Sequence, residues 1–340
     1  MIGIRVDANE KIAMGHLMRC LSIAKQLKTL EQDVLFIVSE EHSVQQVEEE
    51  GFRCICLYNS YREKDEELSR LLELIQQYRI NKILIDSYEV TQQYMSAIQS
   101  YCKVVYIDDM NLFRYPADMI INYTFKTEMQ EYVGKGYDKE LFLLGSQYVP
   151  LRPAFAQTCI DIKENVEDIF LTTGGADEYD MLVGILESMQ YSSLMKDKRK
   201  HVVVGKFYRN FPKLRELAEN NDTIRIYHNI PDIWNVMKMC DLAISAGGTT
   251  LAELSAYGIP TICFAIADNQ LKGTQAYAKE NMMTFAGNVM QKKDDVIKNV
   301  IFEAERLVGE FQARVNLSKR ANAFIDGNGA MRIAESIIAI

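Results

Sequence analysis

One short stretch of the sequence places a histidine where a glycine-containing loop is expected to become a helix: residues 12–20 read IAMGHLMRC. The chain has only four histidines. The dipole at a helix N-terminus favours a neutral imidazole, which can act as a general base near pH 7. Histidine is also a poor helix cap, so helix stability does not readily explain His16. By its position alone His16 is either a catalytic base or a polar residue that caps the helix, and Arg19 either shares its site or is solvated.

A second stretch with chemical potential is the sequence SAGGTTLAE at residues 245–253. A strand is expected to end just before the two glycines, and a helix to begin near Thr249 after them. The free backbone N–H groups at such a helix N-terminus suit a phosphate or diphosphate, and glycine lets the anion approach closely. The alternative is plain helix capping, because Thr250 and Glu253 fit a capping box. A second glycine pair in the same half of the chain, Gly174–Gly175, favours phosphate binding.

Other familiar chemical motifs are absent or weak in the sequence. Neither a GxxxxGK[ST] phosphate loop nor a GxGxxG turn after a strand occurs, which argues against NTPase, kinase and dehydrogenase chemistry. Asp86 and the pair Asp108–Asp109 follow expected strands and could in principle form a carboxylate metal site. Acids at strand ends more often hold loops, so we predict neither a metal nor a cofactor. The seven dispersed cysteines are predicted to be reduced thiols.

The elements that would position these residues alternate regularly along the chain. Short apolar runs are followed by stretches with apolar residues at helical spacing, which predicts parallel sheets covered by helices on both faces. One series precedes the proline-containing segment at residues 149–158 and a second follows it. We therefore predict the α/β class, with two doubly wound Rossmann-like domains facing a cleft, at residues 1–155 and 156–340. The last helical stretch is expected to pack back on the N-terminal domain.

In open parallel sheets, ligands bind beyond the carboxyl ends of the strands. Applied to this chain, that rule gathers most of the glycine pairs and isolated acids at the expected carboxyl ends. The loops concerned are residues 7–16, 86–88, 108–109, 174–177, 247–250 and 268–270. Their convergence is stronger evidence for a ligand site than any one motif.

Composition narrows the range of partners. The 340 residues include 48% hydrophobic and 25% charged residues, which is typical of a soluble globular protein. The net charge of −9 argues against nucleic acids and anionic membranes as partners. No apolar run is long enough to cross a bilayer, and the N-terminus lacks a signal-peptide pattern. We expect a cytoplasmic protein without a membrane span, and a monomer or a homodimer.

Together the motifs resemble the PseG family, bacterial UDP-sugar hydrolases of pseudaminic acid biosynthesis, which are similar in fold to GT-B glycosyltransferases such as MurG. The resemblance runs nearly end to end. Its most specific parts are RVDANEKIAMGHLMRCLSIA at residues 5–24 and GSQYVPLRPAF at residues 145–155. The motifs IDSY, IDD, LTTGGAD, AGGTTLAE and DNQ support it, although AGGTTLAE alone would mark only the wider GT-B group.

The resemblance implies that UDP-2,4-diacetamido-2,4,6-trideoxy-β-L-altropyranose is hydrolysed to UDP and the free sugar without a metal. His16 would be the base that activates water against the anomeric carbon. The backbone and hydroxyl groups at residues 247–249 would hold the diphosphate, Glu253 the ribose and the backbone near Ile230 the uracil. The full set of residues expected to bind substrate comprises Gly15, Arg19, Asp86, Tyr88, Asn122, Gly174, Gly175, Ile230, Gly247, Gly248, Thr249, Thr250, Glu253, Asn269 and Gln270.

The sugar side of the resemblance is matched less closely than the nucleotide side. Asn269 and Gln270 would face the sugar, with Tyr88 and Arg19 on the other wall. Departures from the family pattern occur at three places in this sequence: Ala13 stands where glycine is more usual, Asp268 stands where glutamate is usual, and the INYT segment at residues 121–124 lacks a second asparagine. The exact sugar therefore stays open.

Two alternatives to this hydrolase also stay open. A GT-B glycosyltransferase, or a hydrolase of another UDP-sugar in surface or spore-coat polysaccharide synthesis, would show much the same motifs. The acidic segment EEHSVQQVEEE at residues 40–50 argues against a membrane-associated transferase. A non-catalytic sensor of nucleotide sugars would keep the UDP site, but the retained His16 argues against it.

Overall fold

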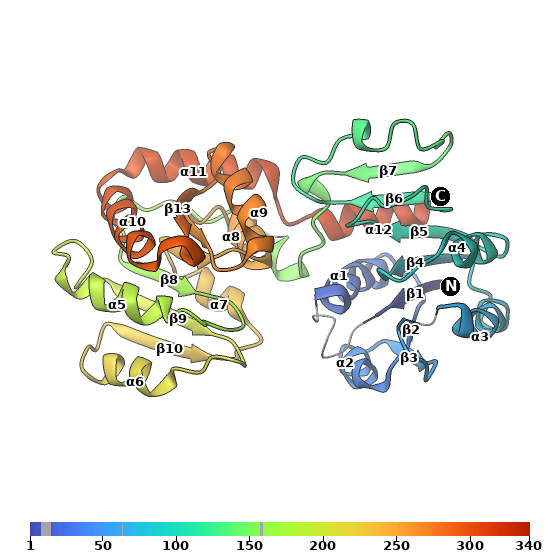
Figure 1. The fold of residues 1–340 in the computed structure, drawn as a ribbon, viewed down its shortest axis with the longest axis horizontal. Helices are drawn as coiled ribbons and strands as arrows, with labels where there is room; N and C mark the ends of the chain where they lie inside the picture. Colours follow the sequence, from blue (N-terminus) through green and yellow to red (C-terminus); the bar gives the residue numbers. More distant parts are fainter. Residues whose placement is uncertain (8–14, 63, 157–158) are drawn as a thin grey trace. The chain divides into compact units, whose positions relative to one another are not determined.

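The computed structural model describes residues 1–7, 15–62, 64–156 and 159–340. The chain folds into two compact units, and each unit contains one β-sheet (Figure 1). Unit 1 comprises Met1–Ala156 and Gly327–Ile340, and unit 2 comprises Gln157–Asp326. Residues 327–340, which the sequence analysis assigned to the second domain, therefore belong to the same compact unit as the N-terminus.

Unit 1 is built on a sheet of seven parallel strands in the order β3-β2-β1-β4-β5-β6-β7. The strand order runs outward in both directions from β1 and β4, as in a doubly wound fold. The strands are β1 (Ile2–Val6), β2 (Val34–Val38), β3 (Arg53–Cys56), β4 (Lys82–Asp86), β5 (Lys103–Ile107), β6 (Met119–Asn122) and β7 (Leu141–Leu144).

Helices cover both faces of this sheet. They are α1 (Gly15–Thr29), α2 (Val44–Glu49), α3 (Lys64–Gln77), α4 (Gln92–Gln99) and α12 (Gly329–Ala339), with short 3₁₀ turns at Glu41–Ser43, Met129–Glu131, Ser146–Tyr148 and Pro153–Phe155. Phe36 in β2 belongs to a buried cluster with α1, α2 and α12. Its neighbour Ile37 belongs to a separate cluster with α3 and α4. Such strands, apolar on both sides, are typical of parallel sheets that are buried on both faces.

Unit 2 repeats the architecture with six parallel strands in the order β10-β9-β8-β11-β12-β13. Its strands are β8 (Asp168–Thr172), β9 (Arg199–Val204), β10 (Ile224–His228), β11 (Leu242–Ala246), β12 (Thr261–Ala265) and β13 (Thr284–Asn288). Its helices are α5 (Met181–Tyr191), α6 (Phe211–Glu219), α7 (Ile233–Met237), α8 (Thr249–Tyr257), α9 (Asp268–Lys279), α10 (Val289–Gly309) and α11 (Phe311–Phe324). The predicted fold class, two doubly wound parallel sheets, is confirmed.

The chain enters α12 through a turn that only glycine permits. Gly327 has a φ of +79°, and a Cβ placed on it would lie 1.9 Å from the carbonyl oxygen of Phe155. After this turn α12 packs on α1 and buries apolar residues such as Ile333 and Ile337. Within the described ranges, no helix has the length and apolar character needed to span a bilayer.

Candidate active site

The carboxyl ends of four neighbouring strands in unit 1 carry polar side chains. Since β1, β4, β5 and β6 are adjacent and parallel, their ends meet at one edge of the sheet. Asp86 ends β4, Asp109 follows β5, and Tyr123 follows β6. Helix α1 packs on the face beside this edge and brings His16 and Arg19 to it. Residues far apart in the sequence thus form one hydrogen-bonded group.

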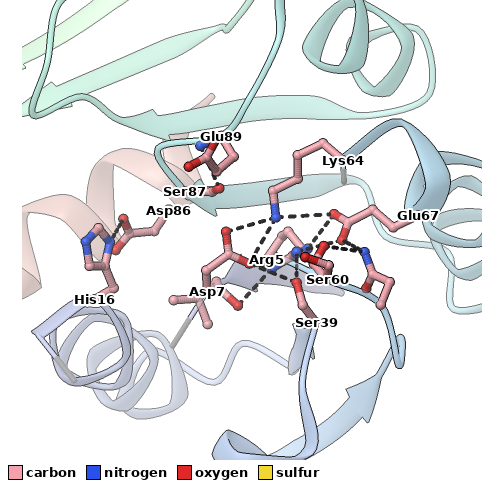
Figure 2. Close-up of polar contacts among 12 residues, drawn as sticks. Arg5, Asp7, His16, Ser39, Ser60, Lys64, Glu67, Asp86, Ser87 and Glu89 are labelled. Carbon is pink, nitrogen blue, oxygen red and sulfur yellow. Dashed lines mark hydrogen bonds and ion pairs between the residues drawn. The ribbon is translucent and has the colours of Figure 1, made fainter. Parts of the chain in front are cut away.

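His16 and Asp86 form the pair at the centre of this group (Figure 2). The distance from His16 Nδ1 to Asp86 Oδ1 is 2.6 Å, and His16 is only 8% exposed. Burial alone would raise the pKa of Asp86, but the charge and hydrogen bonds of Arg19, together with His16, lower it. An ionised Asp86 accepts a hydrogen bond from Nδ1–H, so the lone pair of the imidazole lies on Nε2. Among the residues that the structure describes, none hydrogen-bonds to Nε2.

Arg19 also holds the carboxylate of Asp86. Its Nε lies 2.6 Å from Asp86 Oδ2 and its Nη2 lies 2.5 Å from Asp86 Oδ1, a two-point contact between planar groups. Arg19 Nη1 donates to Asp109 Oδ2 at 2.8 Å and also to the hydroxyl of Tyr123. Arg19 Nη2 also lies 3.0 Å from His16 Nδ1, because both nitrogens donate to the same oxygen. Asp86 and Asp109 therefore share a guanidinium.

Tyr88 forms a wall beside His16. The two rings meet edge to face, with their centroids 4.6 Å apart. The Tyr88 hydroxyl donates to Asp109 Oδ2 at 2.9 Å, and burial and then Asp109 raise its pKa to about 12. Tyr88 is 44% exposed, so its ring can contact a ligand while its hydroxyl is held. A neutral phenol at this position can donate or accept a hydrogen bond but cannot act as an anion near pH 7.

Asn122, which the sequence analysis placed among the substrate-binding residues, supports a loop in the structure. Its Nδ2 donates to the hydroxyl of Tyr132 at 2.9 Å, and its Oδ1 accepts from the backbone of Thr124 at 3.0 Å. Tyr132 in turn donates to the buried Asp108 at 2.9 Å. Asp108 also accepts from the backbone of Asn111 at 2.6 Å, which fixes the loop after β5. These contacts occupy the Asn122 amide and position the neighbouring Asp109.

The glycine turn of unit 2 lies between β11 and α8. Gly248 has a φ of +145°, a conformation that side chains rarely adopt, and it is the residue that precedes α8. A Cβ on Gly247 would lie 2.7 Å from Cβ of Gln270, so the turn and α9 pack closely. No side chain caps α8, because its N-cap is a glycine. The alternative of a capping box at Thr250 is therefore wrong, and the N-terminus of α8 can receive an anion.

Four further predicted residues of unit 2, Gly174, Gly175, Ile230 and Asn269, follow strands at the same edge of its sheet. Gly174–Gly175 follow β8, and the backbone of Gly205, after β9, donates to the carbonyl of Gly174 at 3.1 Å. A Cβ on Gly205 would lie 2.5 Å from Cα of Gly175, so the two loops pack closely. Ile230 follows β10 and is partly exposed, while Asn269 is exposed at the start of α9. Each lies where the carboxyl ends of parallel strands place ligand-binding loops.

One residue of the candidate site was not predicted from the sequence. One predicted segment lies outside the residues that the structure describes. Tyr123 was missed as a partner of Arg19, although its place after β6 follows once the strand order is known. Gly15 is exposed as the first residue that the structure gives for α1, and residues 8–14, including Ala13, lie outside the described residues. Within the described part of the chain, no cluster of three or more metal-ligating side chains occurs.

Comparison with curated proteins gives relatives of low identity, and no protein-family model matches the chain. The spore coat polysaccharide biosynthesis protein SpsG of Bacillus subtilis is 22% identical over 338 residues, or 98% of this chain and 96% of that protein. The UDP-2,4-diacetamido-2,4,6-trideoxy-beta-L-altropyranose hydrolase of Campylobacter jejuni is 23% identical over 253 residues, or 73% and 85%. An uncharacterised protein of Methanocaldococcus jannaschii is 26% identical over 277 residues; the match covers 77% of this chain and about half, 54%, of that protein.

Solved structures resemble the chain over nearly its whole length. MurG of Acinetobacter baumannii has a TM-score of 0.69 at 11% identity, with 100% of this chain and 99% of that chain covered. UDP-GlcNAc 2-epimerase of Neisseria meningitidis, solved with UDP-GlcNAc bound, has a TM-score of 0.70 at 12% identity and full coverage of both chains. At such low identity the likeness shows the fold alone. The chain has the two-sheet fold of the GT-B proteins.

Proposed function

We propose that this protein is a UDP-sugar hydrolase. In the proposed reaction water attacks the anomeric carbon, and UDP and the free sugar are released. The observation that carries the proposal is the His16–Asp86 pair, in which the carboxylate engages Nδ1 and leaves Nε2 as the basic nitrogen. Similarity to the Campylobacter jejuni hydrolase and the GT-B fold support a UDP-sugar as the substrate.

In the proposed reaction, His16 Nε2 accepts a proton from a water molecule as the water oxygen bonds to the anomeric carbon. The bond from that carbon to the oxygen of the β-phosphate breaks, and its electron pair leaves with UDP. Asp86 orients the imidazole and stabilises the imidazolium that forms, as the carboxylate does in a Ser-His-Asp triad. Arg19 holds Asp86 in place and keeps it ionised.

The glycine turn in unit 2 is proposed to bind the leaving group, UDP. We propose that Gly247, Gly248 and the start of α8 hold the diphosphate, where backbone N–H groups and the helix dipole stabilise the charge that develops. Glu253 is proposed to bind the ribose and the backbone near Ile230 the uracil. Asn269 is proposed to contact the sugar. UDP is a good leaving group, so positioning a water and stabilising this charge are the main requirements.

The sugar that we propose first is 2,4-diacetamido-2,4,6-trideoxy-L-altrose, because the Campylobacter jejuni hydrolase acts on its UDP derivative and matches 73% of this chain. A second candidate is another UDP-sugar of polysaccharide synthesis, with water or a glycan as the acceptor. The match to SpsG over 98% of the chain favours this alternative. A substrate panel separates the two.

The test is release of UDP from the diacetamido-trideoxy-altrose derivative by the intact protein, with and without EDTA. We expect release that survives EDTA and falls at least about a hundredfold in His16→Ala, the scale of a lost general base. His42→Ala, at an exposed histidine on the same unit, is the matched control and should retain the full rate. Tight UDP binding without turnover of this substrate would contradict the assignment. An equal rate in His16→Ala would contradict the role of the histidine.

A further inference from the structure

A buried network of charges lies next to the His16–Asp86 pair (Figure 2). Its members, which we call the Arg5–Glu67 network, are Arg5, Asp7, Ser39, Lys64 and Glu67. Arg5 donates to both carboxylate oxygens of Glu67, at 2.8 and 2.7 Å, and to Asp7 at 2.7 Å. Lys64 Nζ lies 2.9 Å from both oxygens of Asp7. Ser39 donates to Asp7 at 2.9 Å and accepts from Arg5.

The network is balanced in charge and almost completely buried. Two cations face two carboxylates, and no member is more than 2% exposed. Burial alone would raise the pKa of Asp7, but Arg5 and Lys64 lower it to about 2, so Asp7 is an anion near pH 7. Removing four charges from water is costly, so a buried ion network is weak evidence for stability, and in some proteins such groups instead define one conformation.

Asp7 is the member that joins this network to the candidate active site. It directly follows β1, whose last residue, Val6, is the register partner of Asp86 in β4. The backbone N–H of Asp7 donates to the carbonyl of Asp86 at 3.3 Å, and the neighbouring Ser87 is one of the groups that lower the pKa of the Asp7 carboxyl. On the opposite side, Tyr106 in β5 donates to the carbonyl of Ser87 at 3.1 Å. Residues 86–87 are thus held from both neighbouring strands.

We infer that Asp7, held by Arg5, Lys64 and Ser39, is a positioning residue that fixes Asp86 for its hydrogen bond to His16. Its effect on turnover rests on the proposed function, in which His16 is the base. The His16 Nδ1–Asp86 distance of 2.6 Å leaves little room for a shift of the β4 end, and a displaced carboxylate would no longer hold the imidazole in one tautomer. A network that only fastened α3 to the sheet would leave this tautomer unchanged.

The test uses the four histidines of the chain as reporters. Nitrogen NMR of the side chains distinguishes an Nδ1–H from an Nε2–H ring, and the spectrum of His16→Gln assigns the His16 signal. We expect the Nδ1–H form of His16 in the intact protein. In Asp7→Asn, which keeps the side-chain shape and removes the charge, we expect a mixture of both forms. In the same variant, kcat should fall about tenfold to a hundredfold, with the Kd of UDP unchanged.

The matched control is Asp168→Asn, which removes a buried carboxylate bonded to His201 in unit 2. It should alter the His201 signal and leave that of His16 unchanged. Ser39→Ala serves if Asp7→Asn does not fold, because it removes one contact to Asp7 while every charge remains, and it should shift the His16 tautomer in the same direction. An unchanged His16 spectrum in a folded Asp7→Asn or Ser39→Ala protein would overturn the inference. The NMR result stands without a substrate, so it is distinguishable from failure of the proposed function.

Discussion

The two units contain groups of side chains with the same chemistry and different surroundings. In unit 1, His16 Nδ1 lies 2.6 Å from Asp86, which Arg19 grips at 2.6 and 2.5 Å. In unit 2, His201 Nε2 lies 2.8 Å from Asp168. Arg199 donates to both carboxylate oxygens of Asp168, each at 2.6 Å. Both histidines are buried. Residue types and distances alone would assign the two groups the same role.

Two features separate the groups. Asp86 ends β4, at the carboxyl edge where ligands bind, whereas Asp168 and Arg199 begin β8 and β9 at the opposite edge of their sheet. The second ring nitrogen of His201 accepts from the hydroxyl of Tyr227 at 3.0 Å. The second nitrogen of His16 has no such partner among the described residues. A histidine with both nitrogens occupied is structural, and a histidine oriented through one nitrogen can act as a base through the other.

The largest expected effect is a difference in kcat between the variants of the two carboxylates. Asp86→Asn should lower kcat about a thousandfold, because the amide can hold the imidazole in the wrong tautomer. Asp168→Asn should leave kcat within about twofold and lower the free energy of unfolding by about 1–3 kcal/mol, since the lost bonds are partly exposed on the Arg199 side. Steady-state kinetics and urea unfolding of both variants check this. Similar losses of kcat in both would remove the distinction between the groups.

The second largest expected effect is a difference in kcat between variants of the two arginines. Arg19→Lys keeps the charge and loses the planar two-point contact to Asp86, so kcat should fall about tenfold to a hundredfold. The Kd of UDP, measured by titration calorimetry, should not change in this variant, because the proposed diphosphate contacts lie in unit 2. Arg199→Lys is the control and should keep the full rate. A large rise in the Kd of UDP in Arg19→Lys would instead indicate that Arg19 binds the nucleotide.

The smallest effect is expected at the two tyrosines. Tyr88→Phe keeps the ring against His16 and loses the hydrogen bond to Asp109, so kcat/KM should fall only about threefold to tenfold. Tyr227→Phe leaves the second nitrogen of His201 unpaired and should lower the free energy of unfolding by about 1 kcal/mol without changing the rate. Kinetics and thermal unfolding of the pair measure both. Loss of activity in Tyr227→Phe would refute the structural role of His201.

The fold class and the centre of the candidate site could be predicted from the sequence because local patterns carry them. Alternating apolar runs and amphipathic stretches predict a doubly wound sheet. The strand-end rule selects His16, Asp86 and Tyr88, and Arg19 follows one helical turn after His16. The structure places these four side chains in one group of direct contacts. The glycine turn was likewise readable, since Gly248 precedes α8.

What the local patterns could not supply is the order of the strands. The Arg5–Glu67 network joins side chains 62 positions apart, and Arg199 meets Asp168 because β8 and β9 are register partners. The position of His201 relative to other residues in the sequence did not indicate a ligand role. The occupied amide of Asn122 was also hidden, because its partner Tyr132 lies in an irregular segment whose path no periodicity predicts.

The central claim is that His16 activates water against the anomeric carbon of a UDP-sugar. Turnover in heavy-oxygen water, with mass spectrometry of the UDP released, tests it most directly. The account predicts UDP without the heavy isotope, because the bond that breaks joins the anomeric carbon to the phosphate oxygen, and it predicts almost no UDP from His16→Ala. Labelled UDP, which would mean attack at phosphorus, or an undiminished rate in His16→Ala would contradict it.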